Sequence, residues 1–253
     1  MAADIGQQIS KIWDEDAAAY DEMHDHVPLR PHEVAAWRAT LRRLLPDPPA
    51  AVLDAGAGTG FISLILAGQG YEVTAVDFSE QMLAILKSKA ARLGLNVNVV
   101  QADVADLPGG QAFDAVVERD IMWTLLDPAA ALSAWRTAAP AGRLVLIEAT
   151  WGKKASGVWA AQCRADQVIG RIRHLMGRPG SCRHDDYPAP IARMLPYVGG
   201  ILPAEAVGLV ESSPWGPARF ERLTSIEQAT RSDRGLLADL LGAAPRWAVT
   251  AGS

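Results

Sequence analysis

The stretch VLDAGAGTGF, residues 52–61, constrains the fold of this chain more than any other feature. An apolar run typical of a buried strand leads into three glycines, Gly56, Gly58 and Gly60, and apolar residues at helical spacing follow as far as Gly70. A strand that turns through glycines into a helix brings its backbone close to a ligand. The stretch therefore predicts an α/β sheet with a binding site at the glycine loop.

Strand-type and helix-type segments alternate along most of the chain. Strands are expected at residues 50–56, 71–77, 97–103, 113–120, 142–150, 218–229 and 246–252. Helices are expected at residues 4–27, 31–45, 61–70, 79–94 and 127–139. This alternation predicts a mostly parallel sheet with helices on both faces.

The chain divides into four parts. We predict a helical N-terminal arm at 1–48, a ligand-binding core at 49–150, a helical cap insertion at 151–205 and the end of the core sheet at 206–253. An insertion after the fifth strand would lie over the carboxyl ends of the strands and cover a substrate pocket.

The composition argues against several classes of function. Binding nucleic-acid phosphates needs clustered Lys and Arg, and the net charge here is −5. No apolar run approaches the roughly 20 residues that span a bilayer, and the acidic start lacks the features of a signal peptide. The two cysteines, Cys163 and Cys182, are too few for a disulfide scaffold. We expect a cytoplasmic monomer or homodimer with no nucleic-acid or membrane partner.

Acidic residues follow the first five predicted strands. They are Asp54, Asp77, Asp103, the run Glu118–Arg119–Asp120, and Glu148. The carboxyl ends of parallel strands meet at one edge of the sheet, where ligands of such folds bind. This series predicts a ligand site along that edge.

The glycine loop does not match a phosphate-binding motif. A dinucleotide fingerprint would need a glycine where Phe61 stands, and the loop lacks the Lys of a P-loop. Loop amides and the helix start suit a carboxylate, and Asp54 is close enough to orient an ammonium group. Asp77 follows Gly56 by 21 residues, the approximate spacing at which an acid binds ribose hydroxyls. Asp103 can accept from an adenine amino group. Amino acid, ribose and adenine together make S-adenosylmethionine.

The same residues carry a family resemblance. VLDAGAGTGFISLILAGQGYEVTAVDFSEQML, QADVADLP, FDAVVERDIMWTLLDP and GRLVLIEA resemble, in order and spacing, the motifs of class I S-adenosylmethionine-dependent methyltransferases. The resemblance is close over 50–150 and implies a Rossmann-like seven-stranded sheet. It also implies a set of cofactor contacts: Asp54, Gly56, Gly58 and Gly60 at the methionine moiety, Asp77 at the ribose, Phe78 and Met82 beside the adenine, Asp103 and Val104 at the adenine edge, and Arg119 lining the pocket by its backbone.

The arm and the cap contribute further candidates. IWDEDAAAYDE resembles the arm of small-molecule members of the family, in which a tyrosine, here Tyr20, covers the cofactor. Aromatic residues of the cap indicate a mostly apolar, aromatic or heteroaromatic substrate. The candidate substrate contacts are Trp123, Trp151, His174 and Tyr197. His24 and Asp120 are the candidates for a base or an orienting acceptor.

The activity expected is methyl transfer to O or N of a small specialised metabolite, with a C-methyltransferase as an alternative. A cyclase or regulatory protein that keeps the cofactor fold without transferring methyl is a rival, and so is a nicotinamide-dependent oxidoreductase. ERDIMW does not match the tetrapeptide of DNA amino-methyltransferases, and Glu118 alone does not reproduce the glutamate pair of protein arginine methyltransferases. Asp120 and Glu148 do not otherwise match the spacing of a catechol-type metal site, and neither His24–His26 nor Arg183–Asp186 repeats a recognised ligand spacing. No metal is expected.

Overall fold

The computed structural model describes residues 2–21, 26, 30–107, 109–110, 112–150, 187–231 and 245–252. Its centre is a seven-stranded sheet of order β3-β2-β1-β4-β5-β7-β6. The strands are β1 (Ala51–Ala55), β2 (Glu72–Asp77), β3 (Asn98–Gln101), β4 (Ala115–Arg119), β5 (Arg143–Ala149), β6 (Ala218–Arg222) and β7 (Arg246–Gly252). β1 to β5 are parallel, and β7 runs antiparallel to both β5 and β6. The predicted mostly parallel, Rossmann-like sheet is confirmed.

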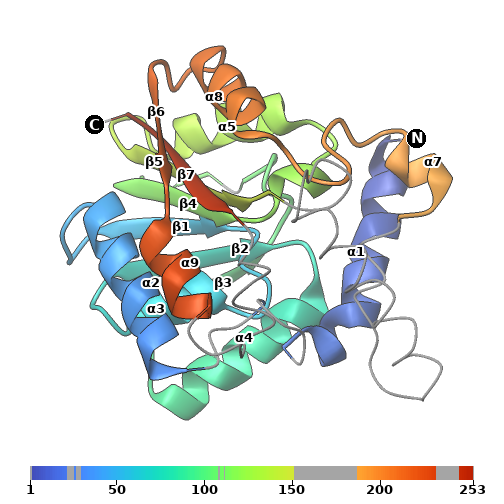
Figure 1. The fold of residues 1–253 in the computed structure, drawn as a ribbon. Coiled ribbons are helices and arrows are strands. Elements are labelled where there is room, and N and C mark those ends of the chain that lie inside the picture. The colour runs from blue at the N-terminus through green and yellow to red at the C-terminus, as the bar shows by residue number, and fades with distance from the viewer. Residues whose placement is uncertain are drawn as a thin grey trace.

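Helices cover both faces of this sheet (Figure 1). They are α1 (Ala2–Tyr20), α2 (Pro31–Leu44), α3 (Phe61–Ala67), α4 (Glu80–Leu93), α5 (Pro128–Ala138), α7 (Ala189–Ala192), α8 (Pro203–Glu211) and α9 (Thr224–Arg231), with a 3-10 turn η1 (Met122–Thr124). The helices α2, α3, α4 and α9 pack on one face and α5 and α8 on the other. The helix α1 stands beside α4 as an arm.

Local signals set the ends of two of these helices. The Ser79 hydroxyl caps α4 by accepting from the Met82 amide, and Gly94 ends it with a left-handed φ of 65°. Asp127 caps α5 by accepting from the Ala130 amide, and Pro128 follows at the first helical position. These helices therefore begin where the sequence predicts.

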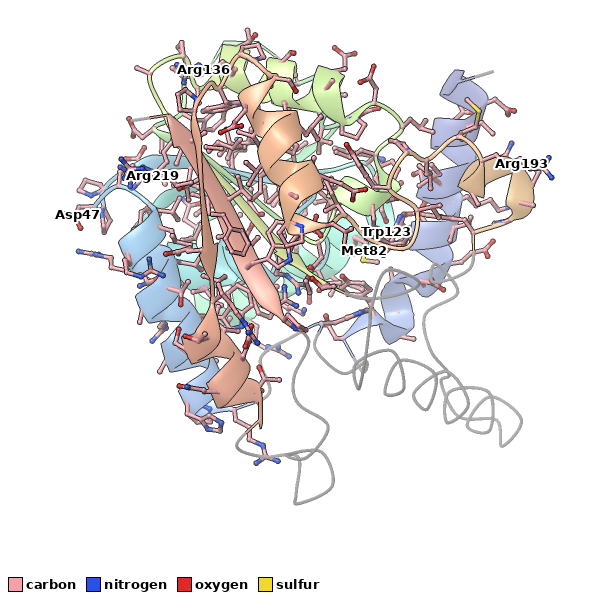
Figure 2. The ribbon with its side chains drawn as sticks, turned by 45° about the horizontal axis from the view of Figure 1, so that its top comes forward. Asp47, Met82, Trp123, Arg136, Arg193 and Arg219 are labelled. Atoms are coloured by element: carbon pink, nitrogen blue, oxygen red, sulfur yellow. The ribbon has the colours of Figure 1, made fainter. Side chains whose placement is uncertain are left out.

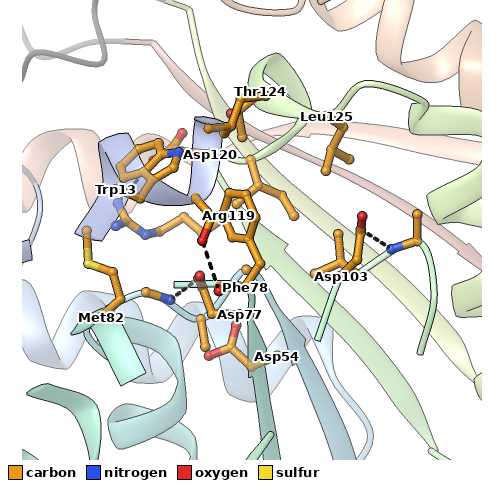
Figure 3. Close-up of a pocket in the computed structure, with 18 of the residues that line it drawn as sticks. Trp13, Asp54, Asp77, Phe78, Met82, Asp103, Arg119, Asp120, Thr124 and Leu125 are labelled. Atoms are coloured by element: carbon orange, nitrogen blue, oxygen red, sulfur yellow. Dashed lines mark hydrogen bonds and ion pairs between the residues drawn. The ribbon is translucent and has the colours of Figure 1, made fainter. Parts of the chain in front are cut away.

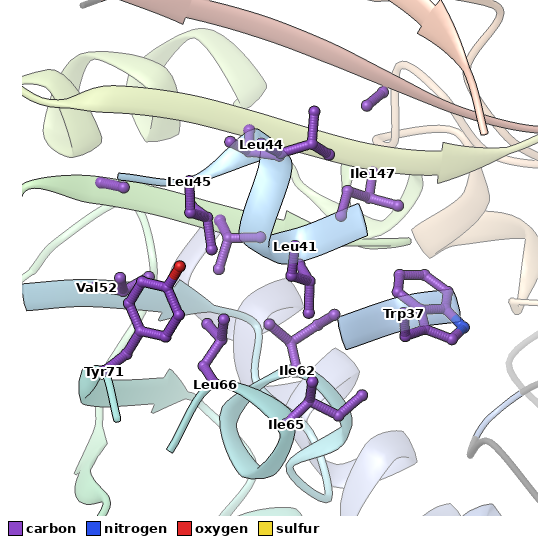
Figure 4. Packing of buried hydrophobic residues seen from close by; sticks show 14 of the residues in the cluster. Trp37, Leu41, Leu44, Leu45, Val52, Ile62, Ile65, Leu66, Tyr71 and Ile147 are labelled. Carbon is purple, nitrogen blue, oxygen red and sulfur yellow. The ribbon is translucent and has the colours of Figure 1, made fainter. Parts of the chain in front are cut away.

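The core on the α2 and α3 face is a continuous apolar cluster (Figure 4). Leu41 and Leu66 are fully buried in it, and Tyr71 closes one end by donating its hydroxyl to the Pro46 carbonyl at 2.9 Å. Burying one such leucine contributes about 2 kcal/mol. The cluster holds α2 and α3 against β1, and so fixes where the glycine loop leaves the sheet.

The side chains divide between this interior and the periphery. In Figure 2, Met82 and Trp123 lie inside the molecule, whereas Asp47, Arg193 and Arg219 project at its edge. Among the described residues, no helix is long and apolar enough to cross a membrane, and no three His, Cys, Asp or Glu side chains gather in a way that could hold a metal.

One element differs from the prediction. The strand expected over 218–229 ends at Arg222, and Thr224–Arg231 is the helix α9. Ile226 and Glu227 of this helix are buried together, with Ile226 in the core on the α2 face. The helix α9 also contacts α2, so tertiary packing rather than the local pattern decides this element. The first helix also ends earlier than the predicted residue 27, since α1 ends at Tyr20.

The predicted cap lies largely outside the described residues, which omit 151–186. Of the remainder, Tyr187 and Ile191 are buried against α1 in a cluster with Ile5 and Ile9. The helix α8 packs on β6 and β7. It buries Ala206 and Val210 in the core on the α5 face.

Candidate functional site

A cavity of about 560 Å³ opens at the carboxyl ends of β1, β2, β3 and β4 (Figure 3). Most of the predicted site residues line it. They are Tyr20, Asp54, Gly56, Gly58, Asp77, Phe78, Met82, Asp103, Val104, Arg119 and Asp120. Residues of α1, including Ile9 and Trp13, close one side. The structure thus brings together groups from four strand ends and the arm.

The glycine loop has the backbone that its sequence requires. Gly56, Gly58 and Gly60 have φ of 74°, 52° and 92°, a region that disfavours other residues. A Cβ on Gly58 would meet no atom within 4 Å, so the loop leaves open space beside the cavity. Gly60, the N-cap of α3, is not among the residues that line the cavity, and a Cβ there would lie 2.7 Å from Leu86 Cγ.

The loop amides are used within the protein. Those of Gly56 and Ala57 donate to the Val76 carbonyl, and that of Gly60 donates to the Ala57 carbonyl. The Gly58 amide donates to Asp77 Oδ2 at 2.8 Å. These four loop amides therefore already have partners within the protein. What the loop offers a ligand is space and the start of α3.

Two carboxyl groups form the floor of the cavity. Asp77 accepts from Gly58 through one oxygen and from the Ser79 amide through the other, at 2.9 Å. Asp54 accepts from the Ser63 hydroxyl at 2.5 Å. Burial raises the pKa of both carboxyls to about 6, against the hydrogen bonds that lower it. Both acids can accept hydrogen bonds from a ligand while they brace the loop.

The other side of the cavity is more apolar. Phe78 and Met82 line it beside Val104, and Asp103 Oδ1 accepts from the Ala105 amide at 2.9 Å. Trp135 supports this wall from below by donating its indole N–H to the Val104 carbonyl at 2.9 Å. Such a wall suits a flat apolar ring with one polar edge.

The arm is tied to the core by two aspartates that the sequence analysis did not single out. Asp14 Oδ1 accepts from the Ser79 hydroxyl at 2.6 Å and from the Gln81 amide at 3.1 Å. Asp21 accepts from the Thr59 hydroxyl at 2.6 Å and pairs with Lys89. These contacts connect the arm to α4 and to the glycine loop. The acidic character of the arm was the available signal, but the partners lie far along the chain.

The aromatic residues of the arm face the cavity. Trp13 and Tyr20 both line it, with ring centroids 6.0 Å apart in an edge arrangement. Trp13 also donates to the Tyr187 hydroxyl at 3.0 Å. Burial raises the pKa of Tyr20, so its hydroxyl stays protonated at neutral pH. The arm therefore supplies an aromatic wall.

Asp120 follows β4 in an unusual backbone conformation. Its φ of 58° is the one positive value found for a residue other than glycine in the described part of the chain. Oδ2 accepts from Arg119 at 3.0 Å and from Arg246 at 2.9 Å. Strain of this kind concentrates at functional sites. No motif in the sequence pointed to Arg246, which lies at the start of the last strand, β7.

The remaining candidates lie elsewhere. Trp123 is buried with Ile9 and Tyr187, donates its indole N–H to the Asp120 carbonyl at 2.8 Å, and is not among the residues lining the cavity. Tyr197 packs against the core on the α5 face, also away from the cavity. His24, Trp151 and His174 lie outside the described residues.

Comparison with known proteins identifies related sequences. Residues 52–142 match the family model described as a methyltransferase domain. A demethylmenaquinone methyltransferase of Deinococcus radiodurans is 32% identical over 180 residues, which cover 68% of this chain and 73% of that protein. One of Clavibacter sepedonicus is 35% identical over 154 residues, which cover 58% of this chain and 62% of that protein. The chain thus spans less than two thirds of the latter.

A solved structure shares the fold. The geranyl diphosphate C-methyltransferase of Streptomyces coelicolor, crystallised with S-adenosylhomocysteine, matches with a TM-score of 0.54. The match covers 86% of this chain and 75% of that one at 16% identity. At this identity the likeness concerns the fold.

Proposed function

Because the chain belongs to the class I S-adenosylmethionine-dependent methyltransferases, we propose that it transfers the methyl group of S-adenosylmethionine to a small molecule. One observation carries the proposal: the glycine loop, Asp54 and Asp77 line the same cavity as Phe78 and Asp103. This order of groups along the strand ends matches the order of an amino acid, a ribose and an adenine in one ligand.

The residues of the cavity have distinct proposed roles. Asp77 binds the ribose hydroxyls, since each of its oxygens keeps a lone pair after accepting one backbone amide. Asp54 orients the ammonium group, with Gly56 and Gly58 beside the methionine moiety. The other proposed contacts are Phe78 and Met82 on the adenine faces, Asp103 and Val104 at its edge, Arg119 along the pocket and Tyr20 over the sulfonium, as a cation–π contact.

The protein contributes to methyl transfer mainly by positioning the two reactants. When bound, the cofactor supplies an electrophilic methyl carbon. The chain must hold the acceptor atom about 3 Å from that carbon and keep water out, and Trp13 and Tyr20 provide an apolar cover for this. A base is needed only where the acceptor atom carries a proton of high pKa. Asp120, which lines the cavity, and His24 are proposed for that role.

The proposed acceptor is an aromatic or heteroaromatic ring methylated on oxygen or nitrogen, with carbon as the alternative. The two relatives named as demethylmenaquinone methyltransferases support a quinone-type ring within this class. We propose that Trp151 and His174 contact the acceptor.

Calorimetric titration with S-adenosylmethionine and S-adenosylhomocysteine, with NAD and NADP alongside, tests the proposal. Binding of the first pair supports it, and binding of a dinucleotide alone would overturn it. Formation of S-adenosylhomocysteine is then measured with a panel of hydroquinones, phenols and aromatic amines. A protein that binds the cofactor but produces none with any acceptor would fit the rival of a cyclase or regulatory binder.

A further inference from the structure

Two buried glutamates hold one turn at the end of β4. Glu118 and Glu148 are both fully buried. In the parallel register Glu118 lies opposite Leu146, so Glu148, two residues further along β5, faces the same side of the sheet. Glu118 Oε2 accepts from the Ile121 amide at 3.2 Å, and Glu148 Oε1 accepts from the Met122 amide at 2.9 Å. Both glutamates therefore brace residues 120–122.

Each of three neighbouring carboxyl groups also has an oxygen that receives no hydrogen bond. These oxygens are Glu118 Oε1, Glu148 Oε2 and Asp120 Oδ1, and all three are buried without a donor from the described part of the chain. Leaving a charged acceptor buried and unpaired is unfavourable. An ionised carboxylate can only accept, whereas a protonated one can donate to its neighbour. A proton on one of these carboxyls would turn an acceptor into a donor and remove one of the buried charges.

The charges around the cluster also favour a bound proton. Its cationic neighbours are Arg119 of β4 and Arg246 of β7, and both donate to Asp120 Oδ2. If all three carboxyls were ionised, three negative charges would face these two positive charges. One bound proton leaves two negative charges facing two positive charges. Burial, with repulsion from Glu148, raises the pKa of Glu118, and burial, with repulsion from Asp120, raises that of Glu148.

The braced turn is a wall of the cavity. Asp120 and Ile121 both line it. Ile121 also packs on the glycine loop so closely that a Cβ on Gly56 would lie 2.5 Å from Ile121 Cγ2. A displacement of this turn would therefore change the side of the cavity that faces Gly56.

We propose that Glu118 and Glu148 share a proton within the cluster they form with Asp120, and that this proton keeps residues 120–122 in place as the cavity wall. The two glutamates are then positioning residues that touch no ligand. Loss of the proton at alkaline pH would add a third negative charge and push the turn outward. The effect on ligand binding rests on the proposed function, whereas the shared proton does not.

Infrared spectroscopy tests the proton directly. The wild-type protein at about pH 8 should show the carbonyl stretch of a protonated carboxylic acid, because ordinary Asp and Glu are ionised there, and so are Asp54 and Asp77 with a pKa of about 6. The band should be lost in the Glu118→Gln/Glu148→Gln double variant and kept in Glu72→Gln, a control at an exposed carboxyl. A wild-type spectrum without the band, or a double variant that keeps it, would overturn the proposal. If the double variant fails to fold, the pH dependence of the band in the wild-type spectrum tests the proposal by itself.

Binding across pH tests the consequence. Affinity of the wild-type protein for S-adenosylhomocysteine should fall about tenfold over the alkaline pH range in which the infrared band is lost. The double glutamine variant should lose less than about twofold, because an amide does not ionise, while Glu72→Gln should behave as the wild type. Equal alkaline losses in all three proteins would overturn the role of the proton in the wall. Absence of binding at every pH would contradict the proposed function, while the infrared band would still test the shared proton.

Discussion

The guanidinium carbon of Arg119 lies 4.2 Å from the centroid of the Phe61 ring. Phe61 stands where a dinucleotide fingerprint would have its third glycine, so this contact exists only because the fingerprint is broken. The Arg119 side chain is 7% exposed and also donates to Asp120. A largely buried guanidinium needs both kinds of partner. The ring therefore links the start of α3 to the turn that follows β4.

Replacing Phe61 by leucine should lower the free energy of unfolding by about 1–3 kcal/mol, since it removes buried ring area and the cation–π contact. Urea denaturation measures this. Phe220→Leu is the matched control, because Phe220 is 49% exposed and should change stability by less than about 1 kcal/mol. Equal losses in the two variants would mean that the Arg119 contact contributes nothing beyond ordinary packing.

Asp77→Asn should weaken binding of S-adenosylhomocysteine by about 1.5–3 kcal/mol, or roughly 10- to 150-fold. The amide keeps the shape of the side chain but replaces one acceptor oxygen with a donor, which would face either a ribose hydroxyl or the Gly58 amide. Calorimetric titration gives the affinity. Asp47→Asn, at a side chain that is 86% exposed, should leave it unchanged. Full affinity in Asp77→Asn would remove the ribose assignment.

Binding of the cationic cofactor should release protons near pH 6. Burial raises the pKa of Asp54 and Asp77 from 3.8 to about 6, so the folded chain binds more protons than the unfolded chain between these values. Their contribution to stability is accordingly lost as pH rises through that window. An ammonium and ribose hydroxyls favour the ionised carboxyls, so affinity should rise with pH through about 6. Titrations in buffers of different ionisation enthalpy count the protons, and proton uptake at pH 6 would contradict this assignment.

The sequence predicted those parts of the site that follow from the order of the strands along the chain. Asp54 and Asp77 lie in the last two residues of β1 and β2, and Asp103 lies two residues after β3. Parallel strands bring such positions to one edge of the sheet whatever the side chains do. Trp123 was predicted to contact the substrate for the same reason. It lies instead in the 3-10 turn η1, which rotates its ring toward Ile9 and Tyr187. A short turn of this kind leaves no periodic pattern from which the direction of a side chain could be predicted.

Contacts between distant segments were not predictable from one sequence. Arg246 reaches Asp120 across 126 residues, and Asp14 reaches Ser79 across 65. The residues next to an arginine or an aspartate in the sequence do not show whether its side chain will bind a distant residue or water. The strand expected at 218–229 failed for a related reason, since Ile226 is drawn into the core beside α2 by tertiary packing.

The arm should loosen when its aspartate contacts are removed. Asp14→Ala deletes the acceptor of the Ser79 hydroxyl and the Gln81 amide, which are first-turn groups of α4. Loss of such a charged acceptor at a helix start costs about 1 kcal/mol, so the arm should open about fivefold more often. Because Trp13 and Tyr20 of the arm line the cavity, S-adenosylhomocysteine should dissociate faster by a similar factor, while the unfolding of the core should change little. Stopped-flow displacement and limited proteolysis of the arm measure the two effects.

Asp4→Ala, at an exposed position of the same helix, is the control and should match the wild type. A dissociation rate in Asp14→Ala equal to that of the control would show that the arm does not limit release of the ligand.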